Sequence, residues 1–225
     1  MMCKNYITMS KTFLYNIMVG VCLLAFVSCG QNTSEAAKED AKTVEVTQAR
    51  SQESPRIQIY SFGKAINPKA ALLQHELKKL YPSVELVAQP LVLPVEYYNK
   101  EQNKYSGTGL LKYLSKRKNG TAVLGVTDEV IFKANELSPT YGIFGVSPVG
   151  ARVALISTTM PSRKKLSDDH LTKLMLHELG HAFGLKHCSD EHCFMVDAEH
   201  GNKFSQTPSF CKDCKQYLNK RGWTL

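Results

Sequence analysis

The chain has 225 residues, of which 43% are hydrophobic and 21% charged, and its formal net charge is +8. This length allows one domain with a real core, and the composition excludes a disordered chain and a membrane protein with several spans. The basic residues lie in short clusters, such as 115–118 and 163–165, without a basic stripe rich in aromatic residues. We therefore expect a solvated basic surface and no nucleic-acid partner.

The N-terminus has the pattern of an export signal. Lys4 and Lys11 precede an apolar run, residues 12–27, that is shorter than the ~20 residues needed to span a bilayer, which disfavours an uncleaved anchor. Cys29 follows this run, and the segment resembles the lipobox of bacterial lipoproteins. The resemblance implies that residues 1–28 are a signal peptide cleaved before Cys29. It also implies a lipid on that thiol and a protein anchored to a membrane of the bacterial cell envelope.

Residues 29–55 are predicted to be a flexible tether. This stretch is polar and contains no aromatic residue. It therefore buries too little apolar surface to offset the conformational entropy that folding would cost. The folded domain is expected over residues 56–225.

Hydrophobic periodicity predicts an α/β domain, in the broad sense that includes α+β, with a sheet of about five strands. The predicted elements, in chain order, are a strand at 56–62, a helix that starts at Asn67-Pro68, an extended segment at 84–93, a helix at 109–118 ending at Asn119-Gly120, a strand at 121–127, and a hairpin formed by 142–147 and 151–158. The run 121–127 is nearly all apolar, as expected of a strand covered on both faces.

A long helix is predicted from Ser167 to about residue 183. Ser167 supplies an N-cap, and Asp168 and Asp169 supply an acidic first turn. At about 100° per residue, four apolar side chains share one face of this helix: Leu171, Met175, Leu179 and Ala182. His177 and His181 lie on the opposite face. The helix is expected to pack one side on the sheet and to present the two imidazoles on the other.

The chemistry is predicted for the segment HELGHAFGLKH. His177 and His181 are four residues apart on a helix, so both can reach one metal ion, with Glu178 beside the first ligand. Gly184 can adopt a positive φ and turn the chain back, so that His187 becomes a third ligand. Three neutral nitrogens leave one position of a tetrahedral Zn²⁺ for water, as in catalytic zinc sites. Because zinc lowers the pKa of bound water to about 7, we expect peptide hydrolysis with Glu178 as general base.

This motif is similar to that of the metzincin metallopeptidases, HExxHxxGxxH followed by a turn that contains methionine. Within that clan the chain resembles the archaemetzincins, which have a cysteine after the third histidine, then a second cysteine and the methionine, and later CxxC. The corresponding residues here are Cys188, Cys193, Met195, Cys211 and Cys214. The resemblance covers about residues 56–218. It implies a metzincin-like mixed sheet of about five strands with an active-site helix, a small zinc-bound C-terminal subdomain, and Met195 as a hydrophobic floor beneath the metal.

The clan also implies how a substrate binds. In metzincins an edge strand of the sheet pairs with an extended peptide, and residues 151–158 are the candidate for that strand here. Asp197 stands where some metzincins have a tyrosine that contacts zinc, so no tyrosine ligand is expected. Four histidines have no partner in the motif and are predicted to be ordinary surface residues: His75, His170, His192 and His200.

The four late cysteines allow two interpretations. C-x₄-C followed by C-x₂-C suits a tetrahedral site with no position for water, and the resemblance implies the same: a structural zinc held by Cys188, Cys193, Cys211 and Cys214. An exported protein, however, meets an oxidising compartment in which cysteine pairs form disulfides. Zinc is the favoured interpretation, which makes two zinc ions per chain, one catalytic and one structural.

The leading hypothesis is a monomeric, lipid-anchored zinc metallopeptidase that acts on peptides or proteins. The alternative is a non-catalytic zinc-binding or peptide-binding lipoprotein with the same fold. Glu178 disfavours it, because a binder needs the histidines but not the base. A thiol redox protein using Cys211 and Cys214 would need a thioredoxin-like strand-to-helix context, which is absent so near the C-terminus.

Overall fold

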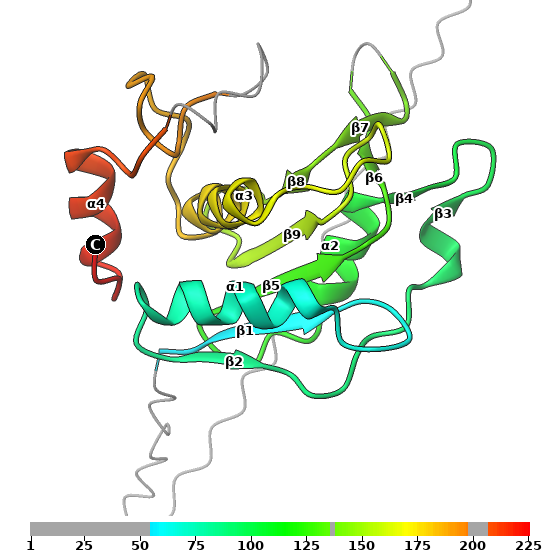
Figure 1. Cartoon of the computed structure of the whole chain (residues 1–225), viewed down its shortest axis with the longest axis horizontal. Helices are drawn as coiled ribbons and strands as arrows, with labels where there is room; N and C mark the ends of the chain where they lie inside the picture. Colours follow the sequence, from blue (N-terminus) through cyan, green and yellow to red (C-terminus); the bar gives the residue numbers. More distant parts are fainter. Residues whose placement is uncertain (1–54, 136–137, 198–206) are drawn as a thin grey trace, which may run out of the picture. The chain divides into compact units, whose positions relative to one another are not determined.

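Figure 1 shows a computed structural model of the chain, which describes residues 55–135, 138–197 and 207–225. The predicted signal peptide, the lipidation site at Cys29 and the tether, apart from Pro55, lie outside these residues. In the described part, no helix is both long enough and apolar enough to cross a membrane.

A five-stranded sheet forms the centre of the fold, in the order β2-β1-β5-β9-β8. Its strands are β1 (Ile57–Ser61), β2 (Val84–Leu86), β5 (Ala122–Thr127), β8 (Gly145–Val146) and β9 (Val153–Ser157). Each neighbouring pair is parallel except β8 and β9, which are antiparallel. The expected mixed sheet of about five strands is confirmed.

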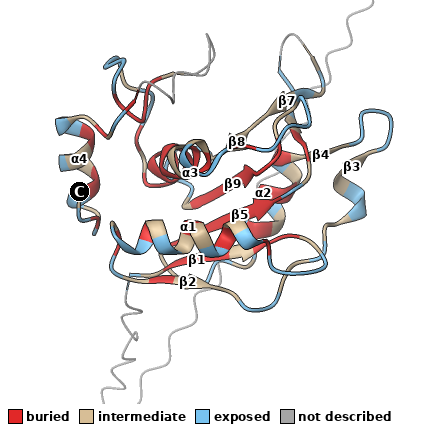
Figure 2. Ribbon diagram, in the orientation of Figure 1, coloured by how far each residue is buried: buried red, intermediate tan, exposed pale blue. Residues whose placement is uncertain are grey.

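Helices cover both faces of this sheet. The helices α1 (Pro68–Lys78) and α3 (Asp168–Ala182) pack on one face, in a core that includes Leu124 and Ile156. The helix α2 (Gly107–Ser115) packs on the other face, in a second core with Val123 and Leu155. Neighbouring residues of β5 and β9 thus enter different cores, and both strands are buried along their length (Figure 2). This confirms that the strand at 121–127 is covered on both faces.

A second sheet was not predicted. Its order is β3-β4-β6-β7, and its strands are β3 (Tyr98–Asn99), β4 (Lys104–Ser106), β6 (Ile131–Lys133) and β7 (Tyr141–Ile143), preceded by the 3₁₀ turn η1 (Val95–Tyr97). Strands of two or three residues are too short to show an apolar–polar alternation. Only Phe144 separates β7 from β8, so the segment 141–146 joins the two sheets.

Two predicted elements have different bounds. The extended segment at 84–93 forms a strand only over β2, and Leu91 makes an isolated bridge to Phe62. The helix expected at 109–118 starts at Gly107, because Ser106 caps it by accepting from the backbone N–H of Gly109. It ends at Ser115, so the predicted cap at Asn119-Gly120 is wrong. Gly120 instead has a φ of 140° where the backbone carbonyl oxygen of Arg56 approaches closely.

The hairpin is confirmed, but the predicted edge strand is wrong. β9 lies between β5 and β8 and is hydrogen-bonded on both sides, so residues 151–158 cannot accept another strand. The edge strand on the other side of the sheet is β2, and on this side it is β8, which was expected only as the partner of β9. Hydrophobicity did not distinguish the two, because both segments are apolar.

The C-terminus folds back on the domain. After α4 (Lys212–Asn219), Trp223 is buried and packs edge-to-face against Tyr81, Phe183 and Phe210. The backbone N–H of Thr224 donates to the carbonyl of Leu80 at 2.9 Å. These contacts attach the last residues to the ends of α1 and α3.

Candidate metal centre

The helix α3 has the packing that the sequence predicts on its apolar face. The four residues of that face, Leu171, Met175, Leu179 and Ala182, are fully buried. The opposite face is also covered, since His177 and His181 are only 6% and 8% exposed. The sequence led us to expect a more open pair of imidazoles. The additional burial comes from the chain after the helix and from β8, which lie over this side of α3.

Gly184 ends α3 as predicted. Its φ is 108°, and its N–H donates to the carbonyl of His181 at 2.9 Å. The N–H of Leu185 donates to the carbonyl of Gly180, also at 2.9 Å. This pair of bonds is a Schellman motif, which requires a left-handed residue after the helix. The chain therefore reverses here and brings His187 back to the two helical histidines.

The three imidazoles are arranged around one point. Nδ1 of His177 donates to the carbonyl of Phe194 at 2.7 Å, and Nδ1 of His181 donates to the carbonyl of Leu185 at 2.8 Å. Each Nε2 therefore carries a lone pair, and the two Nε2 atoms lie 3.1 Å apart. Nitrogens bound to one tetrahedral zinc would be about 3.3 Å apart. The ligand atoms of His177, His181 and His187 all lie within 4.8 Å of one another, which fits a single ion.

The protonation state of the helical histidines also suits a metal. Burial, followed by the neighbouring His181, lowers the pKa of His177 to about 4. Burial lowers the pKa of His181 as well. Both imidazoles are therefore neutral at neutral pH, as metal ligands must be.

Asp197 orients the third histidine. Its Oδ2 lies 3.3 Å from Nδ1 of His187, which leaves Nε2 of that ring for the site. Sequence reasoning excluded a tyrosine ligand at this position but did not foresee this contact. The one available signal was a carboxylate two residues after Met195.

The methionine turn packs directly beneath α3. Met195 is fully buried. A Cβ at Gly180 would lie 2.4 Å from its sulfur, so only glycine lets the turn approach the helix between the two histidines. This contact is consistent with Met195 as the floor of the site.

Glu178 is enclosed between α3 and the edge strand. It is 6% exposed, and burial raises its pKa to about 8, while the charge of Lys133 acts in the opposite direction. A bound cation would act in the same direction as Lys133 and lower the pKa of Glu178. A Cβ at Gly145 of β8 would lie 2.7 Å from the carboxylate, so the glycine leaves the room that Glu178 occupies.

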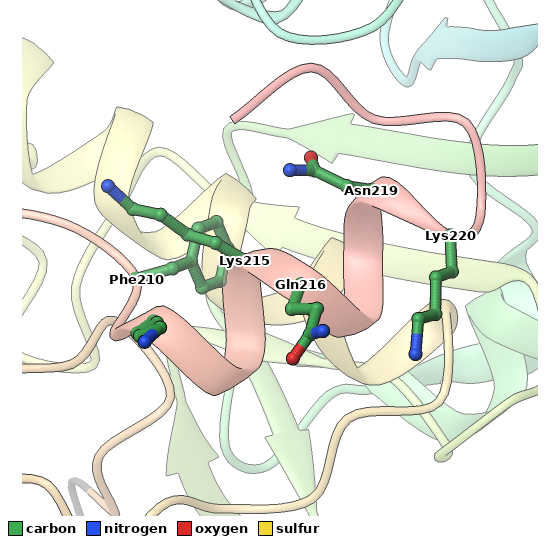
Figure 3. Close-up of a pocket in the computed structure, with 6 residues that line it drawn as sticks. Phe210, Lys215, Gln216, Asn219 and Lys220 are labelled. Carbon is green, nitrogen blue, oxygen red and sulfur yellow. The ribbon is translucent and has the colours of Figure 1, made fainter.

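A cleft of about 450 Å³ opens onto these groups. One wall is formed by β6, β7 and β8 and the other by α3, and the lining includes all three histidines, Glu178 and Asp197. His170, predicted to be an ordinary surface residue, lies on the α3 wall. A second hollow of about 700 Å³ runs along α4 and is lined by Phe210, Gln216, Asn219 and three lysines (Figure 3). Its lining contains no histidine or carboxylate, so we place the hydrolytic chemistry in the first cleft.

The four cysteines meet beside the histidine site. They are free thiols whose sulfurs lie within 4.8 Å of one another, and the sulfurs of Cys188 and Cys211 are 3.8 Å apart. A disulfide needs about 2.05 Å, whereas two sulfurs on one tetrahedral zinc are about 3.8 Å apart. The sulfur of Cys193 also accepts from the backbone N–H groups of Met195 and Cys211. The arrangement fits a metal better than a pair of disulfides.

The two clusters share one segment of chain. Cys188 follows His187 directly, and its N–H donates to the carbonyl of Met195 at 2.8 Å. Cys193 precedes Phe194, whose carbonyl orients His177. A metal on the cysteines would therefore also hold the groups that orient the histidines.

The family model for peptidase family M54 matches residues 59–220. The chain belongs to peptidase family M54. Its relatives include the archaemetzincin of Methanopyrus kandleri, 30% identical over 133 residues, which are 57% of this chain and 73% of the relative. The archaemetzincin of Pyrococcus abyssi is 34% identical over 123 residues, 49% of this chain. That match spans 62% of the relative, less than two thirds of its length.

Solved archaemetzincin structures have the same fold. The crystal structure from Methanopyrus kandleri matches with a TM-score of 0.60 at 24% identity and covers 76% of this chain and 97% of that one. The structure from Archaeoglobus fulgidus, complexed with malonate, matches with a TM-score of 0.58 at 24% identity and covers 72% of this chain and 99% of that one. The expected archaemetzincin resemblance and the metzincin-like fold are confirmed, and M54 membership places the chain among the zinc metallopeptidases.

The contact between Asp197 and His187 predicts an effect on metal affinity. Asp197→Asn should weaken zinc binding at the histidine site about 10- to 100-fold, because it loosens the group that orients the most exposed ligand. Competition with a chromophoric chelator would measure this change. Asp169→Asn is the matched control, since Asp169 pairs with Lys173 and does not line the cleft. Equal affinity in the two variants would show that Asp197 does not support the metal.

Proposed function

We propose that this protein hydrolyses peptide bonds with a zinc ion held by His177, His181 and His187 and with Glu178 as general base. The arrangement of the imidazoles is the main support for this proposal. The Nδ1 atoms of His177 and His181 are hydrogen-bonded to backbone carbonyls, and their Nε2 atoms lie 3.1 Å apart. The bound ion would supply a water of lowered pKa and polarise the scissile carbonyl. A non-catalytic binding protein would have no use for a carboxyl group buried beside the ligands.

The chain's own residues then have distinct tasks. The Glu178 carboxylate accepts the proton of the attacking water and passes it to the leaving nitrogen. Its burial between α3 and Gly145 keeps bulk water from competing for that proton. Phe194, Leu185 and Asp197 hold the three imidazoles in orientation.

We assign substrate pairing to β8. This strand has a partner in the main sheet on one side only, and Gly145 and Val146 line the cleft with Glu178. An extended peptide added to this edge would lie across the histidine site, and its backbone would supply the hydrogen bonds of a further strand.

The role of Glu178 is tested by Glu178→Gln. Hydrolysis should fall by about 10²- to 10⁴-fold because proton transfer is lost, while zinc content stays near that of the wild type. Peptide cleavage and metal analysis of the same preparation would measure both. Glu101→Gln, a change at an exposed loop residue, is the control. Unchanged turnover in Glu178→Gln would refute the assignment, and joint loss of zinc and fold would make Glu178 a structural residue.

We also propose that Cys188, Cys193, Cys211 and Cys214 hold a second, structural zinc. The 3.8 Å separation of two of the sulfurs and the N–H groups directed at Cys193 support it. The four thiolate ligands lie on both sides of a loop, so zinc can bind them all only in the folded chain. The free energy of zinc binding, on the order of 10 kcal/mol, therefore stabilises the fold.

This second site predicts two steps of metal loss. Mild chelation should remove activity first, because the histidine site has an exchangeable position, and should change the melting temperature little. Cys211→Ser should lower the melting temperature sharply. Metal stoichiometry and thiol titration of the denatured, non-reduced mature chain would decide between the two interpretations. Two zincs with four titratable thiols are expected, whereas one zinc without free thiols would mean disulfides.

We propose further that the mature protein begins at Cys29 and is anchored by lipid in the envelope of a bacterial cell, with residues 29–55 as a tether to the domain at 56–225. The lipobox-like end of the apolar run supports this proposal.

Cys29→Ala tests the anchor. The variant should lose palmitate labelling and no longer partition with membranes into detergent, because the lipobox offers one acceptor thiol. Labelling that survives the substitution would contradict lipidation at Cys29. Membrane attachment that persists without labelling would indicate an uncleaved helix.

A further inference from the structure

The wall of the cleft carries a lysine that pairs with no carboxylate of the described residues. Lys133, at the end of β6, has an exposed side chain and lines the cleft together with Glu178. Several other lysines of the domain are held by carboxylates, including Lys69, Lys165 and Lys173. Among the described residues no ion pair joins Lys133 to an acidic side chain.

The other charged groups of the cleft are already engaged or buried. Asp197 contacts His187, and Glu178 is enclosed between α3 and β8. Lys133 lies close enough to Glu178 for its charge to lower the pKa of that carboxyl. Apart from the zinc ligands, the described lining offers two further groups that favour an anion, Lys133 and His170, among mainly apolar and neutral polar side chains.

The position of Lys133 is also suited to contact a bound peptide. It is paired in register with Tyr141 of β7, and both side chains line the cleft. From Tyr141 the chain continues through Phe144 into the edge strand β8. A peptide that pairs with β8 and extends along this wall would therefore pass the ammonium group of Lys133 within a few residues of the scissile bond.

We propose that Lys133 is a specificity-determining residue that selects substrates with a carboxylate near the scissile bond. This inference rests on the proposed hydrolytic function and names the class of substrate. The carboxylate is either the side chain of an Asp or Glu or the C-terminal carboxylate of a short peptide. Both present the same anionic group to the lysine. Binding of the peptide partly removes this ion pair from water. The pair then contributes more binding free energy than a fully exposed ion pair does.

The experiment measures binding separately from turnover. Zinc-loaded full-length Glu178→Gln protein is titrated calorimetrically with four peptides of one backbone, which carry Glu or Gln near the centre and a free or amidated C-terminus. The peptide with the favoured carboxylate should bind about tenfold more tightly than its neutral counterpart, the effect expected of one charge-assisted hydrogen bond. Glu over Gln identifies the side chain as the source, and free over amidated identifies the terminus.

Variants at Lys133 assign the preference. Lys133→Met should abolish the affinity ratio between the charged and neutral peptides, Lys133→Arg should keep it, and Lys133→Glu should reverse it toward a peptide with lysine at the same place. The ratio cancels any general effect of the substitution on the cleft, because such an effect would change the affinities of all four peptides alike. Lys112→Met, at an exposed position on α2 outside the cleft, should leave the ratio unchanged.

The outcomes separate this inference from the proposed function. Equal affinity for charged and neutral peptides, or a preference that survives in Lys133→Met, overturns the role of Lys133. The wild-type protein is assayed for cleavage of the same peptides and of a mixed peptide library. Binding with the expected preference but without any cleavage would support the role of Lys133 and refute peptide hydrolysis. Cleavage without charge preference would do the reverse.

Discussion

Gly184 follows the end of α3 and has a φ of 108°. The two hydrogen bonds of its turn direct the chain back along the helix. The carbonyl of Leu185 then reaches Nδ1 of His181, and His187 joins the two helical histidines. A side chain at position 184 would be strained, and its Cβ would lie 2.5 Å from the hydroxyl of Tyr217 on α4. One glycine thus permits the chain reversal, the approach of His187 to the other two histidines and the docking of α4.

The segment after this turn is held from both ends. On one side, Cys188 and Cys193 belong to the sulfur cluster. On the other side, the carbonyl of Phe194 binds His177, and Met195 packs against Gly180 of α3. An orienting carbonyl helps a metal site only if it stays in place, and a short loop without regular structure has little stiffness of its own. A second metal on the cysteines would supply that stiffness. If the proposed second zinc is bound, this stiffening would give a physical reason for its place next to the histidine site.

The edge strand β8 lies beside the proposed catalytic base and could also pair with the proposed substrate. Gly145 leaves space for the Glu178 carboxylate, and the same strand has one side free to pair with a peptide. The segment 141–146 passes from the small sheet into the main sheet, so it places Lys133 and Glu178 at one cleft although they come from different layers. Burial alone would favour the neutral form of Glu178, and nearby positive charge acts against it. A positive charge at the position of Lys133 therefore helps to keep the buried carboxyl group in the form that can accept a proton.

Local chain geometry was readable from the sequence. Residues four apart on a helix face the same way, and a glycine can end a helix, so His177, Glu178, His181 and His187 were found from spacing alone. The buried strand β5 was found from its unbroken apolar run. Other features depended on contacts between segments that are distant in the chain. Apolar composition could not tell that β8 rather than β9 is the edge, and strands of two or three residues carry no periodicity that would have predicted the second sheet. Nothing in the sequence indicated that Asp197 would lie against His187 or Lys133 beside Glu178. A charged side chain carries no mark of its partner until the tertiary structure brings the two together.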